Sequence, residues 1–130
     1  MYGPRSPAAF CERYQSLDLA ARLEGASPHA LVTLLYDELL GAIAVAESAI
    51  AAGKVPAAQS QIARARTILI ALEAGLDFDR GGAVAAQLGT VYRAMQRRLG
   101  HAQGAAAAPV LAELRGGIAD IADAWRKVAA

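Results

Sequence analysis

Residues 26–53 read ASPHALVTLLYDELLGAIAVAESAIAAG, and the helix signals in this stretch guide the interpretation of the whole chain. Ser27 offers a hydroxyl cap to a helix. Pro28 suits the first helical position, because its φ is fixed and it has no N–H group to leave unpaired. Gly53 is typical of the residue just beyond a helix end. The stretch therefore predicts one helix from about residue 28 to about residue 52.

The same punctuation divides the rest of the chain into three more helices. Pro56 opens the second and Pro109 the fourth, while Gly75-Leu76-Asp77 interrupts the pattern between the second and the third. Their predicted spans are about 56–74, from just after Gly81-Gly82 to about 100, and about 109–128. Four helices with short connections predict an all-α fold, an antiparallel four-helix bundle. We expect residues 1–25 to form a short helical or cap segment and residues 26–130 to form the bundle domain.

The composition supports one compact helical domain. Of the 130 residues, 55% are apolar, 19% are charged and 33 are alanine, with a net charge of +1. Such a chain can bury a core, and its charge balance excludes both a disordered tail and a generic nucleic-acid binder. The single cysteine, Cys11, cannot form an internal disulfide. The first seven residues contain no apolar signal region, and the longest apolar run, Leu39 to Ala46, is too short to span a bilayer. We expect a soluble, cytoplasmic protein without membrane insertion.

Apolar residues recur at helical spacing, but the pattern is wider than a simple core stripe. At about 100° per residue, the third and fourth helices each have one apolar face. These predicted core faces contain Val84, Leu88, Val91, Tyr92, Met95 and Leu99, and Val110, Leu114, Ile118, Ile121, Trp125 and Val128. In the first two helices, Leu34, Leu40, Val45 and Ile70 lie outside the main apolar arc. Such outliers could line a groove for a partner helix, or meet the leading segment or a second copy of the chain.

No arrangement of side chains predicts catalysis or metal binding. His29 and His101 form no paired ligand motif, and helix ends account for both. Asp77, Asp79 and Gly82 match part of a calcium-binding loop, yet the twelfth position is Leu88 instead of a glutamate, so a helix-capping turn is expected. We therefore predict no enzyme, no cofactor and no metal site.

Several motifs, in order along the chain, resemble the flagellar secretion chaperone family, FliS. The most specific is LDFDRGGAVAAQLGTVYRAMQRRL at residues 76–99; the others are Ala-Ser-Pro-His-Ala-Leu at 26–31, Leu-Leu-Tyr-Asp at 34–37, Ala124-Trp125 and Tyr14-Gln15. The positions that match are Ser27, Pro28, Tyr36, Asp37, Asp77, Gly81, Gly82, Tyr92, Met95, Arg97, Arg98 and Trp125, and we expect structural roles for them. The chain departs from the family pattern at Glu38, at Ala83 and at Gly116-Gly117, which interrupts the fourth helix.

The resemblance implies a cytoplasmic export chaperone with a four-helix bundle fold. It would bind the C-terminal helical region of flagellin, mask the apolar polymerisation surface of that region and keep flagellin unassembled and export-competent. Phe10, Cys11 and Tyr14 are then expected to act as a displaceable cap, and Leu34, Leu40, Val45 and Ile70 to contribute to the client surface. The flagellar export gate and an anti-sigma factor are further candidate partners. The alternative is a self-associating bundle, with a weak homodimer in the absence of client, or an adaptor for another secreted helical protein.

Overall fold

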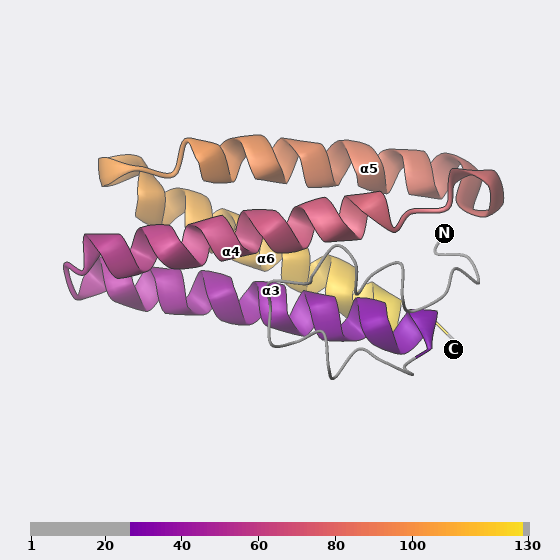
Figure 1. The fold of residues 1–130 in the computed structure, drawn as a ribbon, viewed down its shortest axis with the longest axis horizontal. Coiled ribbons are helices and arrows are strands. Elements are labelled where there is room, and N and C mark those ends of the chain that lie inside the picture. The colour runs from indigo at the N-terminus through magenta and orange to yellow at the C-terminus, as the bar shows by residue number, and fades with distance from the viewer. Residues whose placement is uncertain (1–26, 129–130) are drawn as a thin grey trace.

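The computed structural model describes residues 27–128, which form four long helices and one short 3₁₀ turn. The helices are α3 (Pro28–Ala51), α4 (Val55–Ala74), α5 (Phe78–Gly100) and α6 (Ala107–Arg126), and the 3₁₀ turn η1 (Gly104–Ala106) precedes α6. Figure 1 shows them side by side in an up-and-down arrangement. The predicted all-α antiparallel bundle is thereby confirmed.

Local capping chemistry sets two of the helix starts as the sequence predicts. The Ser27 hydroxyl accepts a hydrogen bond of 3.1 Å from the backbone N–H of Ala30, and Pro28 occupies the first turn. The Asp77 carboxylate accepts a bond of 3.2 Å from the N–H of Arg80, which confirms the capping turn expected there. Each cap satisfies one of the N–H groups that a helix start leaves without an intrahelical partner.

Two predicted boundaries were wrong. The helix α5 begins at Phe78, before the glycine pair, because Asp77 caps an extra turn; Gly82 then kinks the helix with φ +52° and ψ −129°, a conformation that favours glycine. The helix α6 begins at Ala107, two residues before Pro109, since proline is tolerated in a first helical turn. It runs unbroken through Gly116-Gly117, as the predicted span of the fourth helix requires.

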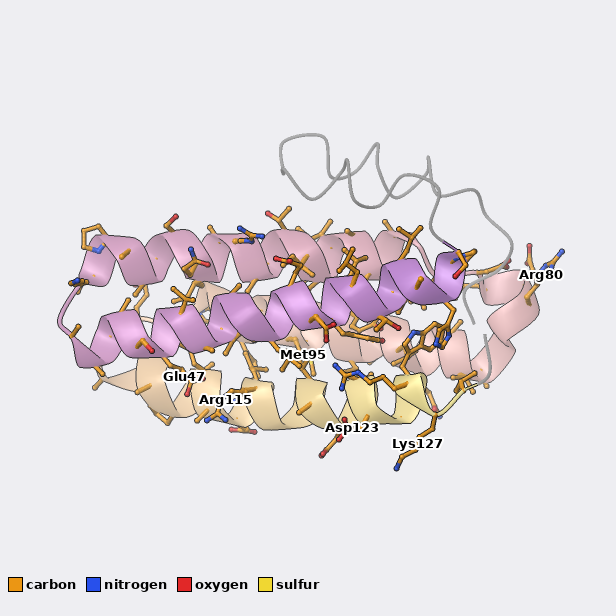
Figure 2. All side chains as sticks on the ribbon, turned by 90° about the horizontal axis from the view of Figure 1, so that it is seen from below. Glu47, Arg80, Met95, Arg115, Asp123 and Lys127 are labelled. Atoms are coloured by element: carbon orange, nitrogen blue, oxygen red, sulfur yellow. The ribbon has the colours of Figure 1, made fainter. Side chains whose placement is uncertain are left out.

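The helices surround the core in the order α6, α3, α4, α5. The helix α4 lies between α3 and α5 in Figure 1, and α6 flanks α3 on the side away from α4 in Figure 2. Extensive contacts join α3 to α4, α3 to α6 and α4 to α5, whereas α5 and α6 touch only sparsely. The bundle therefore has one open seam, between its last two helices.

The helix α3 forms the centre of the core. Among the described residues it is the one helix long and apolar enough to cross a membrane by length and composition. A central bundle helix passes the same test, and the core face of α3 is buried against its neighbours. Its fully buried side chains include Leu31, Leu35, Leu39 and Ile43.

Candidate functional site

The open seam between α5 and α6 contains an apolar groove. Its cavity measures about 240 Å³ and is lined by Tyr36, Val84, Leu88, Ile121, Ala124, Trp125 and Val128. Val84 and Leu88 form the α5 wall. Ile121, Ala124 and Trp125 of α6, with Val128 just beyond its end, form the α6 wall, and Tyr36 reaches the groove from α3. This volume is below the roughly 300–1,000 Å³ typical of small-molecule sites, and it suits a few apolar side chains of a partner.

The groove corrects the predicted core faces of the last two helices. Val84 is 53% exposed, Val91 36% and Val128 50%, although all three were predicted to face the core. The core face of α5 is rotated towards α4 and contains Ala85, Gly89, Tyr92, Met95 and Leu99. Because α5 and α6 do not pack together at this end of the bundle, Val84 and Val128 line the groove instead of packing against each other.

Tyr36 and Tyr92 form a buried polar link across the bundle. Their hydroxyl oxygens lie 2.5 Å apart in a hydrogen bond that joins α3 to α5. Burial, followed by the charge and hydrogen bond of Tyr92, raises the pKa of Tyr36 far above its ordinary value. The hydroxyl of Tyr36 therefore stays protonated, and the tyrosine can line an apolar groove without an unpaired charge.

The α6 wall is anchored to the start of α3. The rings of Trp125 and His29 stack with centroids 4.5 Å apart and planes inclined by 18°. The indole Nε1–H of Trp125 donates a hydrogen bond of 3.2 Å to the carbonyl oxygen of His29. One residue further on, Arg126 pairs with Asp37 at 2.5 Å. The family-matched Tyr36, Asp37 and Trp125 thus hold together the floor and one wall of the groove.

The seam closes towards the α5–α6 connection. A Cβ atom built on Gly117 would lie 3.7 Å from the Cε of Met95, so the two helices meet there. Beyond that point Arg98 of α5 pairs with Glu113 of α6 at 2.8 Å. This hydrogen bond, and then the attraction between the charges, lowers the pKa of Glu113 and raises that of Arg98. The pair is exposed, so salt screens it and it contributes little to stability.

The groove offers an apolar surface and no catalytic group. None of its lining residues is a carboxylate, histidine, lysine, arginine or cysteine. Asp123 and Lys127 project from α6 away from the bundle in Figure 2. Within residues 27–128, no group of three or more His, Cys, Asp or Glu side chains is placed to hold a metal ion. The arrangement can dock an apolar surface, such as one face of an amphipathic helix.

The client-surface residues expected from the sequence do not line this groove. Val45 of α3 and Ile70 of α4 are each 52% exposed, while Leu34 and Leu40 are half-buried against the core. The groove walls come instead from residues that were predicted to face the core, among them Val84, Leu88 and Ile121. Their signal in the sequence was an apolar arc on the third helix that is wider than one packing partner explains. The expected cap residues lie outside the described part of the chain: Phe10, Cys11 and Tyr14.

The remaining positions that match the family motifs lie outside the groove lining. Met95 is buried in the core, Arg97 is exposed, and Arg98 belongs to the ion pair described above. Gly81 precedes the kink at Gly82.

Comparison with known proteins identifies the family. Residues 11–130 match the family model for "Flagellar protein FliS". The sequence is 31% identical to the "Flagellar secretion chaperone FliS" of Salmonella typhimurium, over 93% of this chain and 90% of that protein. It is 29% identical to "Flagellar secretion chaperone FliSB" of Pseudomonas aeruginosa (88% and 90%) and 24% identical to "Flagellar secretion chaperone FliS" of Vibrio cholerae (90% and 86%). With its bundle fold and its motifs, this chain belongs to the FliS family of flagellar proteins.

Proposed function

We propose that this protein is a flagellar export chaperone that binds the C-terminal helical region of flagellin in the cytoplasm. The observation that carries the proposal is the apolar groove between α5 and α6, in a chain whose relatives are named as secretion chaperones. The protein acts by binding and not by catalysis, since the groove walls offer apolar contact alone.

The proposed masking of flagellin follows from the chemistry of the groove and of the client helix. A filament subunit that polymerises through amphipathic helices exposes their apolar faces before assembly, and exposed apolar faces associate prematurely. The groove accepts such a face in helix-to-helix contact, with Val84 and Val128 as the exposed large apolar side chains of its walls. Covering the client helix in this way keeps flagellin unassembled and ready for export.

We propose that the N-terminal segment covers the groove when no client is bound, with Phe10, Cys11 and Tyr14 as the contacting side chains. The position where this segment joins the bundle supports the proposal. Ser27 precedes Pro28 and His29 at the start of α3, and His29 stacks on Trp125 in the groove wall. The segment thus leaves the bundle at the groove, so its effective concentration there is high.

We propose a second, weaker client contact on the outer face of α3 and α4, formed by Leu34, Leu40, Val45 and Ile70. Exposure of Val45 and Ile70 supports it, because large apolar side chains at a surface favour contact with a partner. If Tyr14→Ala and Ile70→Asp both leave flagellin affinity unchanged in a folded protein, the cap and this outer surface are assigned wrongly.

Titration calorimetry of the full chain tests the proposed function. The titrants are flagellin from the same organism and the same flagellin without its C-terminal region. We expect saturable one-to-one binding of the intact form alone, with a negative heat-capacity change from the burial of apolar surface. Equal binding of both forms, or of neither, would contradict the proposal.

The competing function is a bundle that self-associates through the same apolar residues, or an adaptor for another secreted helical protein. The exposed valines of the groove favour it as a second candidate. Light scattering with and without flagellin distinguishes self-association from the chaperone function. A homodimer that flagellin does not dissociate would support self-association, whereas a monomer, or a dimer dissolved by flagellin, supports the chaperone. The export gate and an anti-sigma factor are further proposed partners.

A further inference from the structure

Gly116 and Gly117 occupy the middle of α6, where glycine is unfavourable. Glycine destabilises a helix interior relative to alanine because it has more conformational freedom to lose. Neither residue has a positive φ. A Cβ atom at Gly116 would meet nothing within 4 Å, and one at Gly117 would make an ordinary contact of 3.7 Å with Met95. The packing of this structure therefore accommodates alanine at both positions, and it does not explain the glycines.

The glycine pair separates two halves of α6 with different attachments. On its N-terminal side, Glu113 pairs with Arg98 of α5, and Arg115 pairs with Glu47 of α3 at 2.7 Å (Figure 2). On its C-terminal side, Trp125 and Arg126 contact α3 through His29 and Asp37. Within residues 27–128, the ion pairs of this half join Arg126 to Asp37 of α3 and to Asp123 of α6 itself.

The C-terminal half also provides the whole α6 wall of the groove. Ile121, Ala124, Trp125 and Val128 all follow the glycine pair. The groove closes at the level of Gly117, where α6 meets Met95. The most easily bent point of α6 thus coincides with the boundary between the half that pairs with both α3 and α5 and the half that lines the groove and pairs with α3.

We propose that Gly116-Gly117 is a hinge at which the C-terminal half of α6 turns about its α3 contacts and widens the groove for a client helix. The inference rests on the proposed function for its purpose, and on the geometry of α6 for the motion. Bends in helices occur at glycine because the backbone there has additional conformations available. The opening extends the groove towards Met95, so that a client helix can be seated along the seam.

Hydrogen exchange measured by mass spectrometry on the free full-length protein tests the hinge without any client. Three proteins are compared: the wild type, the double variant Gly116→Ala/Gly117→Ala, and the control Gly41→Ala. Gly41 is an exposed glycine within α3, and a Cβ there would also meet nothing within 4 Å. Each alanine should raise the Tm by about 4 °C through helix propensity alone.

The informative quantity is the exchange rate of residues 118–121, whose N–H groups bond to carbonyls at or before the glycine pair, divided by that of residues 111–115 in the same protein. The Gly41→Ala control shows how far added global stability alone changes this ratio. We expect a ratio above about ten in the wild type and in Gly41→Ala, and a ratio of about one to three in the double variant. A ratio near one in the wild type, or the wild-type ratio in the double variant, would overturn the hinge.

Flagellin binding then links the hinge to the groove. The double variant should bind the C-terminal region of flagellin at least about tenfold more weakly than the wild type, whereas Gly41→Ala should bind it equally well. Equal binding by the double variant would overturn the hinge as a device for client entry. If the wild type itself fails to bind flagellin, the proposed function fails, and the exchange ratio still decides whether α6 bends at the glycines.

Discussion

Tyr36 illustrates how single side chains serve both the core and the site. It is almost completely buried, its hydroxyl is bonded to that of Tyr92, and its side chain still forms part of the groove lining. Trp125 does the same from α6, since it stacks on His29 while lining the groove. A substitution at either residue therefore changes the stability of the bundle and the shape of the docking surface together.

The raised pKa of Tyr36 predicts a loss of stability at alkaline pH. Above about pH 10 the unfolded state releases the proton of this tyrosine while the folded state keeps it, so the free energy of unfolding falls as the pH rises. One such group contributes a slope of about −1.4 kcal/mol per pH unit. In Tyr36→Phe this contribution should be absent, and the loss of the hydrogen bond should cost about 1 kcal/mol at pH 8.

Urea unfolding of both proteins between pH 8 and pH 11 measures these quantities. The comparison with the wild type removes the contributions of the titrating groups that do not contact Tyr36. Equal slopes above pH 10 would show that Tyr36 loses its proton in the folded protein as easily as in the unfolded one.

At the scale of single residues, the features that could be predicted from the sequence are those that depend on neighbours along the chain. The caps at Ser27 and Asp77 follow from a side chain and a backbone N–H three residues apart, and the structure confirms both. The exposure of Val84 and Val128 could not be predicted in the same way. It depends on how closely α5 and α6 pack, which is a property of the assembled bundle and not of either helix.

At the scale of elements, α5 and α6 differ from the two central helices in how completely they are paired. The helix α3 has neighbours on two sides and its most apolar residues are fully buried, whereas α5 packs well on α4 alone. The helix positions were predictable because proline, glycine and capping residues mark their ends. The true start of α5 was missed because Gly81-Gly82 was interpreted as a break, although Asp77 caps a turn before it.

The kink in α5 predicts opposite effects for two glycine-to-alanine substitutions. Gly82 has φ +52° and ψ −129°, so Gly82→Ala should lower the free energy of unfolding by about 1 to 2 kcal/mol. Gly41 lies in regular helix with free space around it, so Gly41→Ala should raise it by up to about 1 kcal/mol. Chemical denaturation of the two variants and the wild type measures both changes in the free energy of unfolding. A stabilising Gly82→Ala would show that the fold does not require the kink.

At the scale of the whole molecule, a bundle with three well-packed helix pairs and one open seam supports a stable fold and an exposed binding surface at once. The extensive contacts of α3 and α4 support the core, so the α5–α6 seam can stay open without unfolding the domain. The fold class and the family could be predicted from the sequence, because helix-end signals and several family motifs occur in order along the chain. The groove depends on residues from three helices, and no single periodic pattern locates it.

Charged substitutions on three surfaces test whether the groove is the primary client site. Val84→Asp and Val128→Asp place a carboxylate in the groove walls, Ile70→Asp places one on the outer face, and Val55→Asp is the matched control. Val55 is 60% exposed at the start of α4, at the end of the bundle away from the groove opening, where a carboxylate also suits the helix dipole. All four positions are exposed, so the variants should fold as the wild type does.

Titration calorimetry of these four variants with the C-terminal region of flagellin is the most direct measurement. Burial of an unpaired carboxylate against an apolar client is costly, so each groove variant should lose at least about tenfold in affinity. Ile70→Asp should lose only about two- to fivefold in affinity, because Ile70 belongs to the secondary contact. Val55→Asp should bind flagellin as the wild type does. Wild-type affinity in both groove variants would contradict the account, since flagellin would then be held elsewhere on the bundle.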